Sequence, residues 1–496
     1  MGQRAISKNT LFYGDNLEII RQYLADESID LIYLDPPFNS NRNYNVLYKE
    51  ESGTESTSQI KAFEDTWHWS YETEDQYRAL TARGDKLGAL LEALVGAMGR
   101  NQMTAYLVMM AIRLVELHRV LKPTGSLYLH CDPTASHYLK LLLDMIFGAK
   151  QFRNEMIWIY SRMAAKGQKQ LSRCHDVIFW YSKSQSWVFN VDEIRLPYSE
   201  KSKARAGYKK TNLGGGSPKS QICELNELGK FPEDWIQIPF IRGKEYLGYP
   251  TQKPLTLLER ILQASSNPGD VVLDPFCGCG TAIHAAYKLE RIWVGIDITP
   301  LATTLIKSRL YSAFKIEAKK DYELLGEPTT LTDAHHLAQQ DRYQFQWWAL
   351  GLLPAFPYGG QGDSKQGKKG SDKGIDGIMT FRDSGEDHEK RIIVQVKSGK
   401  VSSRDIRDLN GTVDREKNAV IGVFITLEPP SRNMVLEALE LGRYKSVVFK
   451  REYPKIQILT LEDLLNGAKV QFPGTDTTLK QAQREEPNLG EQKPLL

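Results

Sequence analysis

The chain is poor in cysteine, with 5 among 496 residues. Cys131, Cys174, Cys223, Cys277 and Cys279 form an odd and sparse set, which excludes a disulfide framework and predicts a reducing compartment. Cys277 and Cys279 also lack partners at the spacing of a zinc site. We therefore interpret this pair as small loop residues and not as metal ligands.

Long apolar runs are absent as well. No window approaches the length of a membrane span, and the N-terminus has no apolar signal core. The net charge of +3 is too small to indicate a partner by itself. We expect a cytoplasmic protein without membrane contact, and the length predicts two or three domains.

The most informative stretch is an apolar segment that runs into an acid and two prolines. Leu31–Leu34 has the composition of a buried parallel strand, and the prolines after it end the hydrogen-bond ladder and stiffen the turn. Asp35 is then held at the carboxyl end of a strand, where open α/β sheets bind ligands. The Asp35 carboxylate and the Pro36 carbonyl can accept hydrogen bonds from an amino group, and Phe38 can stack on its base. The alternative is a tight turn with a capping aspartate.

A second pattern combines two strands, two acids and a glycine-rich turn. Val271–Leu273 predicts a strand, D-P-F-C-G-C-G-T (Asp274–Thr281) a turn into a helix, and Trp293–Asp297 a further strand that ends in an acid. Glycines at such a turn let a ligand approach the backbone, and the helix N-terminus adds a positive dipole. An acid after the next strand is the usual partner of ribose hydroxyls.

Between these patterns, residues 152–242 are rich in cations mixed with aromatic residues and glycines. This texture suits a DNA backbone and groove-reading loops, and the alternative is a solvated surface loop. The cations include Arg162, Lys166, Lys169, Arg173, Lys183, Lys201, Lys203, Arg205, Lys209, Lys210 and Lys219.

Taken together, D-P-P-F after one strand and D-P-F-x-G-x-G-T after another resemble the amino-group DNA methyltransferases that use S-adenosylmethionine. The order, with the catalytic tetrapeptide first and the cofactor loop last, resembles the β class of that family. Further matching pieces are G-D-N-L-E (Gly14–Glu18), Y-P-T-Q-K-P-L (Tyr249–Leu255) and G-I-D-I (Gly295–Ile298). The resemblance implies an α/β fold with a permuted Rossmann-like methyltransferase sheet.

The resemblance also implies roles for individual residues. Asp35 and Pro36, with Pro37 beside them, would hold the target amino group, and Phe38 would stack on a base that has left the duplex. Asp297 would bind the ribose hydroxyls of the cofactor. The other implied cofactor residues are Asp274, Phe276, Gly278, Gly280 and Thr281 for the pocket, Asp15 near the adenine, and Thr251 and Lys253 near the methionine end.

The implied substrate is double-stranded DNA at a specific sequence. In this family D-P-P-[YF] mostly accompanies adenine N6 and S-P-P-[YF] mostly cytosine N4, so Asp35 favours adenine. Cytosine N4 stays open as the alternative, and methylation of RNA or protein is a further one. β-class relatives are often dimers, which makes a homodimer an expectation.

A separate pattern lies nearer the C-terminus. Asp376, followed by a strand that bears Gln395 and Lys397, resembles the Mrr-like branch of the PD-(D/E)xK nucleases. In that case Asp376 and Gln395 would hold Mg²⁺, and Lys397 would help activate a water. Gln346 stands where a helix glutamate is expected. The alternatives are an ordinary α/β domain with a surface lysine and a nuclease-like fold that binds DNA without cutting it.

These patterns predict a methyltransferase domain over residues 1–325, a linker at 326–340, a smaller α/β restriction-endonuclease-like domain at 341–473 and a disordered tail at 474–496. Residues about 152–242 would form the target-recognition segment of the first domain. Two functional hypotheses follow. One is a single-chain restriction–modification enzyme with Mg²⁺-dependent cleavage. The other is a methyltransferase whose C-terminal domain only binds DNA.

Overall fold

The computed structural model of this chain describes most of the sequence in stretches separated by gaps. The described residues are 3, 5–37, 68–161, 169, 171–204, 209–210, 221–222, 225–241, 243–247, 249, 251–353, 355–358, 374–383, 389–446, 448–476, 478 and 482–485. No helix in these ranges combines the length and the hydropathy of a membrane-spanning segment.

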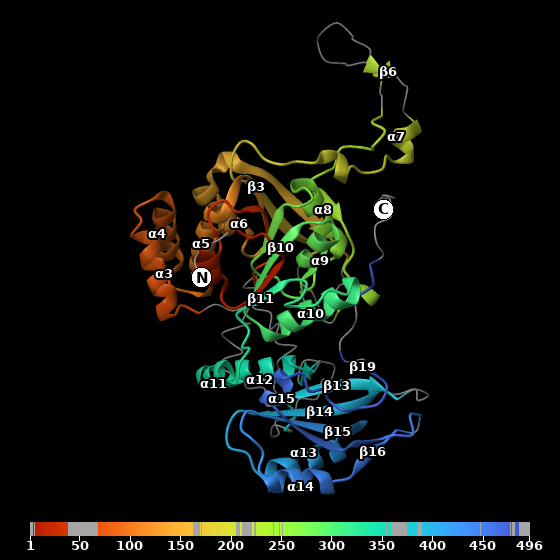
Figure 1. The fold of residues 1–496 in the computed structure, drawn as a ribbon. Helices are drawn as coiled ribbons and strands as arrows, with labels where there is room; N and C mark the ends of the chain where they lie inside the picture. Colours follow the sequence, from red (N-terminus) through yellow and green to blue (C-terminus); the bar gives the residue numbers. More distant parts are fainter. Residues whose placement is uncertain are drawn as a thin grey trace.

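A nine-stranded sheet forms the larger domain (Figure 1). The order across the sheet is β11 (Glu323–Leu325), β1 (Thr10–Tyr13), β10 (Ile292–Asp297), β9 (Val271–Asp274), β2 (Ile29–Leu34), β3 (Leu121–Cys131), β5 (His175–Ser182), β4 (Phe152–Ile159) and β8 (Trp235–Gln237). From β11 to β3 all neighbouring strands are parallel, whereas β5 runs antiparallel to both β3 and β4.

Helices cover both faces of this sheet, which is why its central strands are apolar on both sides. One face packs against α1 (Asn16–Tyr23), α5 (Gln102–Val120) and α6 (Ser136–Leu143), with α3 (Tyr71–Thr81) and α4 (Lys86–Met98) outside them. The other face packs against α8 (Leu255–Ser265), α9 (Thr281–Lys288) and α10 (Pro300–Phe314). The predicted α/β fold class is therefore confirmed.

The strand order brings together two segments that are far apart in the chain. β2 lies beside β9, with Leu31 paired to Val272 and Ile32 to Leu273. Because these strands are parallel, their carboxyl ends meet at one edge of the sheet. The turn after β2 and the glycine-rich turn after β9 are thus neighbours.

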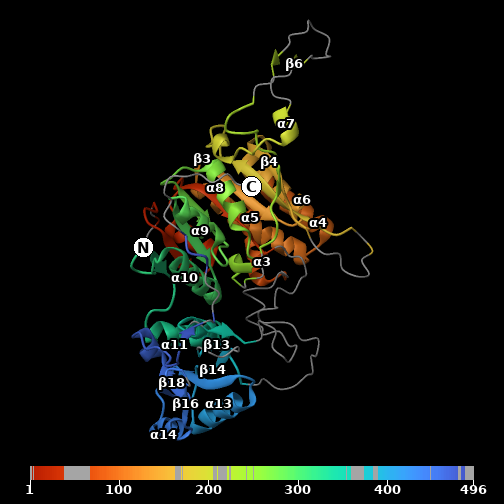
Figure 2. The same ribbon diagram turned by 90° about the vertical axis from the view of Figure 1, so that its right-hand side faces the viewer.

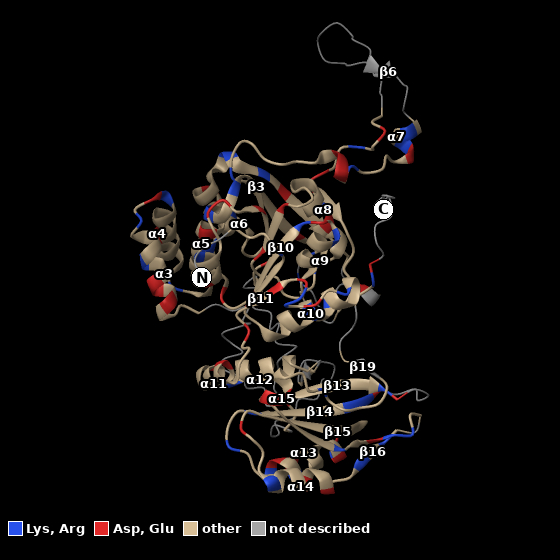
Figure 3. Cartoon of the chain, viewed as in Figure 1, with Lys and Arg blue, Asp and Glu red and all other residues tan. Residues whose placement is uncertain are grey.

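The predicted target-recognition segment is not a separate unit. Its strands β4, β5 and β8 extend the main sheet. Beyond them, α7 (Glu200–Ala204) and the pair β6 (Lys209–Lys210) and β7 (Gln221–Ile222) project from the end of the molecule opposite the C-terminal domain (Figures 1 and 2). Cations mark α7 in Figure 3, where Lys201 and Lys203 are exposed.

The smaller domain is built on a second sheet with the order β12 (Phe356–Pro357), β13 (Gly377–Arg382), β14 (Lys390–Lys397), β15 (Ala419–Thr426) and β18 (Ile456–Thr460). One face carries α13 (Ser403–Arg415) and α14 (Arg432–Glu440), and the other carries α12 (Arg342–Gly351) and α15 (Leu461–Leu465). β16 (Arg443–Lys445) and β17 (Glu452–Pro454) form a small hairpin.

The boundary regions differ from the sequence interpretation. Residues 326–340, expected as a linker, contain α11 (Leu331–Gln340), which begins with a capping box and packs on α12. The chain after residue 474 includes β19 (Thr475–Asp476), which pairs with β13, and Glu485, which contacts the first domain. The described part of the predicted disordered tail is therefore held by specific contacts, which a polar composition does not reveal.

Candidate active site at the carboxyl edge of the main sheet

The turn after β2 places Asp35 in a largely buried position. Its side chain is 14% exposed, and its Oδ2 accepts a hydrogen bond from the ammonium group of Lys253. Its other oxygen, Oδ1, is buried and has no hydrogen-bond partner among the described residues. Pro36 is buried and Pro37 is half-buried. Phe38, predicted to stack on the target base, lies outside the described residues.

Lys253 reaches this position from the Tyr249–Leu255 segment. Its side chain is 9% exposed, and its Nζ also lies 3.4 Å from the Thr251 carbonyl oxygen. Gln252 fixes the loop, since it accepts from Leu247 N at 2.9 Å and donates to Glu245 O at 2.8 Å. The sequence suggested only a place near the cofactor for Lys253, whereas the structure pairs it with the predicted catalytic aspartate.

The glycine-rich turn after β9 has the left-handed backbone that its sequence requires. Gly278 has φ +48° and Gly280 has φ +75°, a region that L side chains rarely adopt. A Cβ at Gly278 would lie 3.1 Å from the ring of Tyr249, so the turn is packed closely from that side. Gly280 is the N-cap of α9, whose N-terminus therefore faces the same edge of the sheet as Asp35.

Two further carboxylates stand at this edge. Asp274 accepts a hydrogen bond from Phe276 N at 3.1 Å, and Asp297 accepts from Gly278 N and Thr299 N, each at 2.9 Å. Burial raises the pKa of Asp297 to about 6, although these hydrogen bonds act to lower it. Burial also raises the pKa of Asp274 well above its ordinary value, and the charges of Asp35 and Asp297 add to this. The site thus concentrates carboxyl groups that disfavour one another's ionisation.

Asp15 is positioned by the first helix. One of its carboxylate oxygens caps α1 through Leu17 N at 2.9 Å, and the other pairs with Arg113 at 2.7 Å. Arg113 also donates to Asn16 at 2.6 Å, and Asn16 donates to Pro275 O at 2.7 Å. Asn16 and Arg113 were missed by sequence reasoning. They join the Gly14–Glu18 loop to the turn after β9.

A buried polar chain behind the site was also missed. Tyr33 Oη lies 3.0 Å from His130 Nδ1, His130 Nε2 lies 3.1 Å from Asp176, and Tyr160 donates to Asp176 at 2.8 Å. Burial would raise the pKa of Asp176, but the hydrogen bonds from His130 and Tyr160 and the positive charge of Lys253 outweigh it and lower the pKa to about 2. The available signal was the position of polar residues at the ends of predicted strands.

The predicted nuclease-like residues do lie together in the second domain. Asp376 Oδ1 accepts from Gln346 Nε2 at 2.8 Å, and Asp376 Oδ2 accepts from Val396 N at 2.7 Å. Gln395 donates to Gly374 O at 3.1 Å, and Lys397 is half-buried at the end of β14. In the part of the chain that the structure describes, no three His, Cys, Asp or Glu side chains gather as a metal site. The predicted Mg²⁺ site is therefore not supported.

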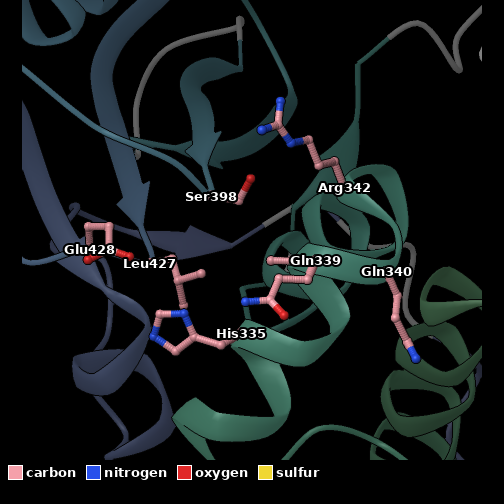
Figure 4. Close-up of a pocket in the computed structure, with 8 residues that line it drawn as sticks. His335, Gln339, Gln340, Arg342, Ser398, Leu427 and Glu428 are labelled. Carbon is pink, nitrogen blue, oxygen red and sulfur yellow. The ribbon is translucent and has the colours of Figure 1, made fainter.

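A hollow of about 480 Å³ opens near these residues, at the ends of β14 and β15 and beside α11 and α12 (Figure 4). Its walls are mainly polar and it contains neither Asp376 nor Gln395. The lining residues are His335, Ala338, Gln339, Gln340, Arg342, Ser398, Leu427 and Glu428.

Comparisons with known proteins match both domains. A family model described as DNA methylase matches residues 29–308. A second model, described as NACHT-associated inactive Restriction Endonuclease 1, matches residues 358–466. A restriction-endonuclease-like C-terminal domain is thus confirmed, whereas its assignment to the Mrr-like branch is not.

Individual relatives match up to about two thirds of the chain. Type II methyltransferase M.HpaI of Haemophilus parainfluenzae is 27% identical over 333 residues, which cover 67% of this chain and 82% of the relative. DNA adenine methyltransferase YhdJ of Escherichia coli (strain K12) is 26% identical over 292 residues, which cover 58% of this chain and 78% of the relative. The solved structure of the cytosine-N4-specific PvuII DNA methyltransferase aligns with a TM-score of 0.38 at 15% identity, covering 61% of this chain and 87% of that one.

Proposed function

Because the chain belongs to the DNA methylase family of N6 and N4 amino-group methyltransferases, we propose that it methylates adenine N6 in double-stranded DNA at a specific sequence, with S-adenosylmethionine as the methyl donor. The observation that carries this proposal is Oδ1 of Asp35, a buried acceptor beside the glycine-rich turn to which none of the described residues donates a hydrogen bond. Such an acceptor suits an exocyclic amino group.

The residues around the turn fit the cofactor. Gly278 and Gly280 hold the turn in a left-handed backbone, and α9 offers its N-terminus at the same edge of the sheet. The Asp297 carboxylate at the end of β10 is a suitable acceptor for ribose hydroxyls. Thr281 and Phe276 complete the proposed pocket, with Asp15 and Thr251 at its ends. When bound, S-adenosylmethionine supplies an electrophilic methyl group on a sulfonium centre.

The chain's own residues would position and polarise the target. Asp35 Oδ1 and the Pro36 carbonyl accept the two N–H groups of the amine, which raises electron density on its nitrogen. The positive charge that develops on that nitrogen during transfer is stabilised by the Asp35 carboxylate, and one of the two N–H protons is then lost to solvent, which leaves a neutral methylamino group. Phe38 stacks on the flipped base. Positioning and electrostatics supply most of the catalysis, and no covalent enzyme intermediate is needed.

Adenine is the proposed base and cytosine N4 is the alternative. The aspartate of D-P-P-F and the similarity to a relative named as an adenine methyltransferase both support adenine. The projecting α7 and the cations of residues 152–242 are the proposed DNA contacts. A homodimer stays a prediction.

For the C-terminal domain we propose DNA binding without cleavage. Both carboxylate oxygens of Asp376 already accept hydrogen bonds from protein N–H groups. A Mg²⁺ ion would have to compete with these contacts for the carboxylate, and the expected helix glutamate is Gln346. The match to a family described as inactive supports this reading over single-chain cleavage.

The experiment that tests the main proposal is nucleoside analysis of DNA incubated with the protein and S-adenosylmethionine. Wild type is compared with Asp35→Ala and with a matched control, Asp75→Ala, on the exposed face of α3. We expect N6-methyladenine with wild type and control and none with Asp35→Ala. N4-methylcytosine would retain the mechanism and replace the base. No methylated base from any variant would refute the proposal.

A further inference from the structure

Arg309, on α10, is a buried arginine beneath the glycine-rich turn. Its side chain is 3% exposed, and burial lowers the pKa of its guanidinium. Nη1 donates to the Cys279 carbonyl oxygen and to Thr281 Oγ1, each at 3.0 Å. Burying a guanidinium is costly unless its donors are well paired. Here the pairing is made to the turn that lies against the proposed cofactor pocket.

The next contact defines the tautomer of a histidine. Arg309 Nε donates to His284 Nδ1 at 3.3 Å, and His284 Nε2 lies 3.0 Å from Glu485 Oε1. An arginine can only donate, so Nδ1 must be the acceptor and Nε2 must carry the proton that is donated to Glu485. Burial and the charge of Arg309 lower the pKa of His284 to about 4, against the pull of Glu485, so the ring is neutral at pH 7. From Arg309 through His284 to Glu485, each hydrogen-bond donor thus faces an acceptor.

Glu485 comes from the far end of the sequence, after the whole second domain. Its Oε2 pairs with Lys288 at 3.0 Å, and its backbone N donates to Ala313 O at 3.2 Å. Lys288 also pairs with Glu259 of α8 at 3.0 Å. In Figure 1 the blue stretch near the C-terminus runs beside α9 and α10 of the first domain. The segment therefore lies against the two helices that carry His284 and Arg309.

We propose that Arg309, His284 and Glu485 form a positioning chain that holds the turn Cys277–Thr281 in its ligand-binding shape, so that the C-terminal segment sets the affinity of the first domain for S-adenosylmethionine. The proposal rests on the proposed function for the identity of the ligand. The three residues act through the turn and are positioning residues, not catalytic ones. Glu485, the last member of this positioning chain, follows the second domain in the sequence and contacts the first domain.

The physical reason is the orientation of one carbonyl group. The Cys279 carbonyl is held by Arg309 on the side of α10. Without that donor, the peptide unit between the two left-handed glycines is held, among the described residues, only by the hydrogen bond from Gly280 N to Cys277 O, so it reorients more easily and the backbone groups that face the ligand move with it. The Glu485 carboxylate supports Arg309 through His284, because a neutral ring that donates to an anion is a better acceptor at its other nitrogen.

The test compares full-length wild type with Glu485→Gln and Arg309→Met. The matched control is Glu317→Gln, which removes one exposed carboxylate close to the end of α10. Two quantities are measured without DNA: the Kd of S-adenosylmethionine by calorimetry, and hydrogen–deuterium exchange of peptides that cover residues 275–284 in the ligand-free protein. A charge-assisted hydrogen bond lost at this site should weaken binding about tenfold and accelerate exchange of the turn about as much. The control should match wild type in both.

The outcomes separate this inference from the proposed function. Unchanged exchange and unchanged Kd in Glu485→Gln would overturn the positioning chain, and this variant suffices if Arg309→Met fails to fold. A wild type that does not bind S-adenosylmethionine would refute the proposed function, while exchange of the turn would still decide the positioning role. Faster exchange with an unchanged Kd would overturn the claim that the C-terminal segment sets affinity.

Discussion

The ammonium group of Lys253 hydrogen-bonds to the same carboxylate, Asp35, that the proposed reaction needs as an acceptor. Both side chains are largely buried, at 9% and 14% exposure. The pair engages one oxygen of Asp35 and leaves the other without a donor in the described part of the chain. Lys253 therefore compensates the charge of a buried carboxylate without occupying both of its acceptor positions.

Removal of that cation should be costly. We expect Lys253→Met to lower the unfolding free energy by about 3 kcal/mol, because a buried carboxylate loses its partner. The kcat of methyl transfer should fall at least about tenfold, because the carboxylate that loses its partner is also the proposed acceptor of the target amine. Urea unfolding and single-turnover methylation measure the two effects. The control is Lys445→Met, whose pair with Glu452 is exposed and should contribute little to stability. Equal losses in both variants would contradict the role given to Lys253.

Asp297 should make cofactor binding depend on pH. Burial raises its pKa to about 6, and its protonated form offers one acceptor fewer to ribose hydroxyls. The affinity for S-adenosylmethionine should therefore fall by about tenfold per pH unit below pH 6 and level off above it. Calorimetry between pH 5 and pH 8 measures this profile. In Asp297→Asn the binding should be weaker at pH 7 and the step near pH 6 should vanish. A flat wild-type profile would count against the assignment.

The acids of the candidate site could be predicted from sequence, whereas their supports could not. Asp35, Asp274 and Asp297 each follow a short apolar strand, and neighbouring parallel strands bring such residues to one edge. The supporting contacts join distant parts of the chain, as between Arg113 and Asp15, 98 positions apart, or between Glu485 and His284, 201 positions apart. Periodicity and local motifs carry no information about such pairs.

In the C-terminal domain, too, the local sequence motif could be predicted and the long-range contacts could not. The Asp376, Gln395 and Lys397 pattern identified a restriction-endonuclease-like fold, since an acid before a strand that bears Q-x-K is local in sequence. Whether the acid is free to bind a metal depends on Gln346 of α12 and on the Val396 amide, which only the packed structure brings to it. For the same reason, the contacts made by the polar tail were missed.

His284 should contribute a pH-dependent term to stability. Its pKa is about 4 in the folded protein against 6.5 for an unperturbed histidine. Between these values the unfolded chain binds a proton that the folded protein does not, so stability rises with pH in this window. The unfolding free energy should thus fall by at most about 1.4 kcal/mol per unit as the pH drops from 6.5 to 4.

The contribution of His284 is isolated by comparison with His284→Gln, which should lack it, and with His137→Gln, an exposed histidine that should retain the wild-type slope. Glu485, whose pKa is lowered to about 2 mainly by its hydrogen bond from His284, loses its stabilising contribution only below pH 4.5. The two windows therefore overlap only between about pH 4 and pH 4.5. Parallel pH profiles for wild type and His284→Gln would show that the ring is not held neutral by its surroundings.

Asp376 should matter for stability and not for cleavage. In Asp376→Ala the Val396 amide and the Gln346 side chain lose their acceptor, so unfolding of the second domain should become easier by about 2–3 kcal/mol. The control is Asp414→Ala, which breaks the partly exposed pair with Lys455 and should cost under about 1 kcal/mol. Urea unfolding measures both. In a parallel assay, unmethylated plasmid DNA should stay intact with Mg²⁺, and EDTA should change neither methylation nor DNA binding. Cleavage that requires Mg²⁺ and disappears in Asp376→Ala would instead mean that the carboxylate binds the ion despite its contacts with Gln346 and Val396, and that the C-terminal domain is an active nuclease.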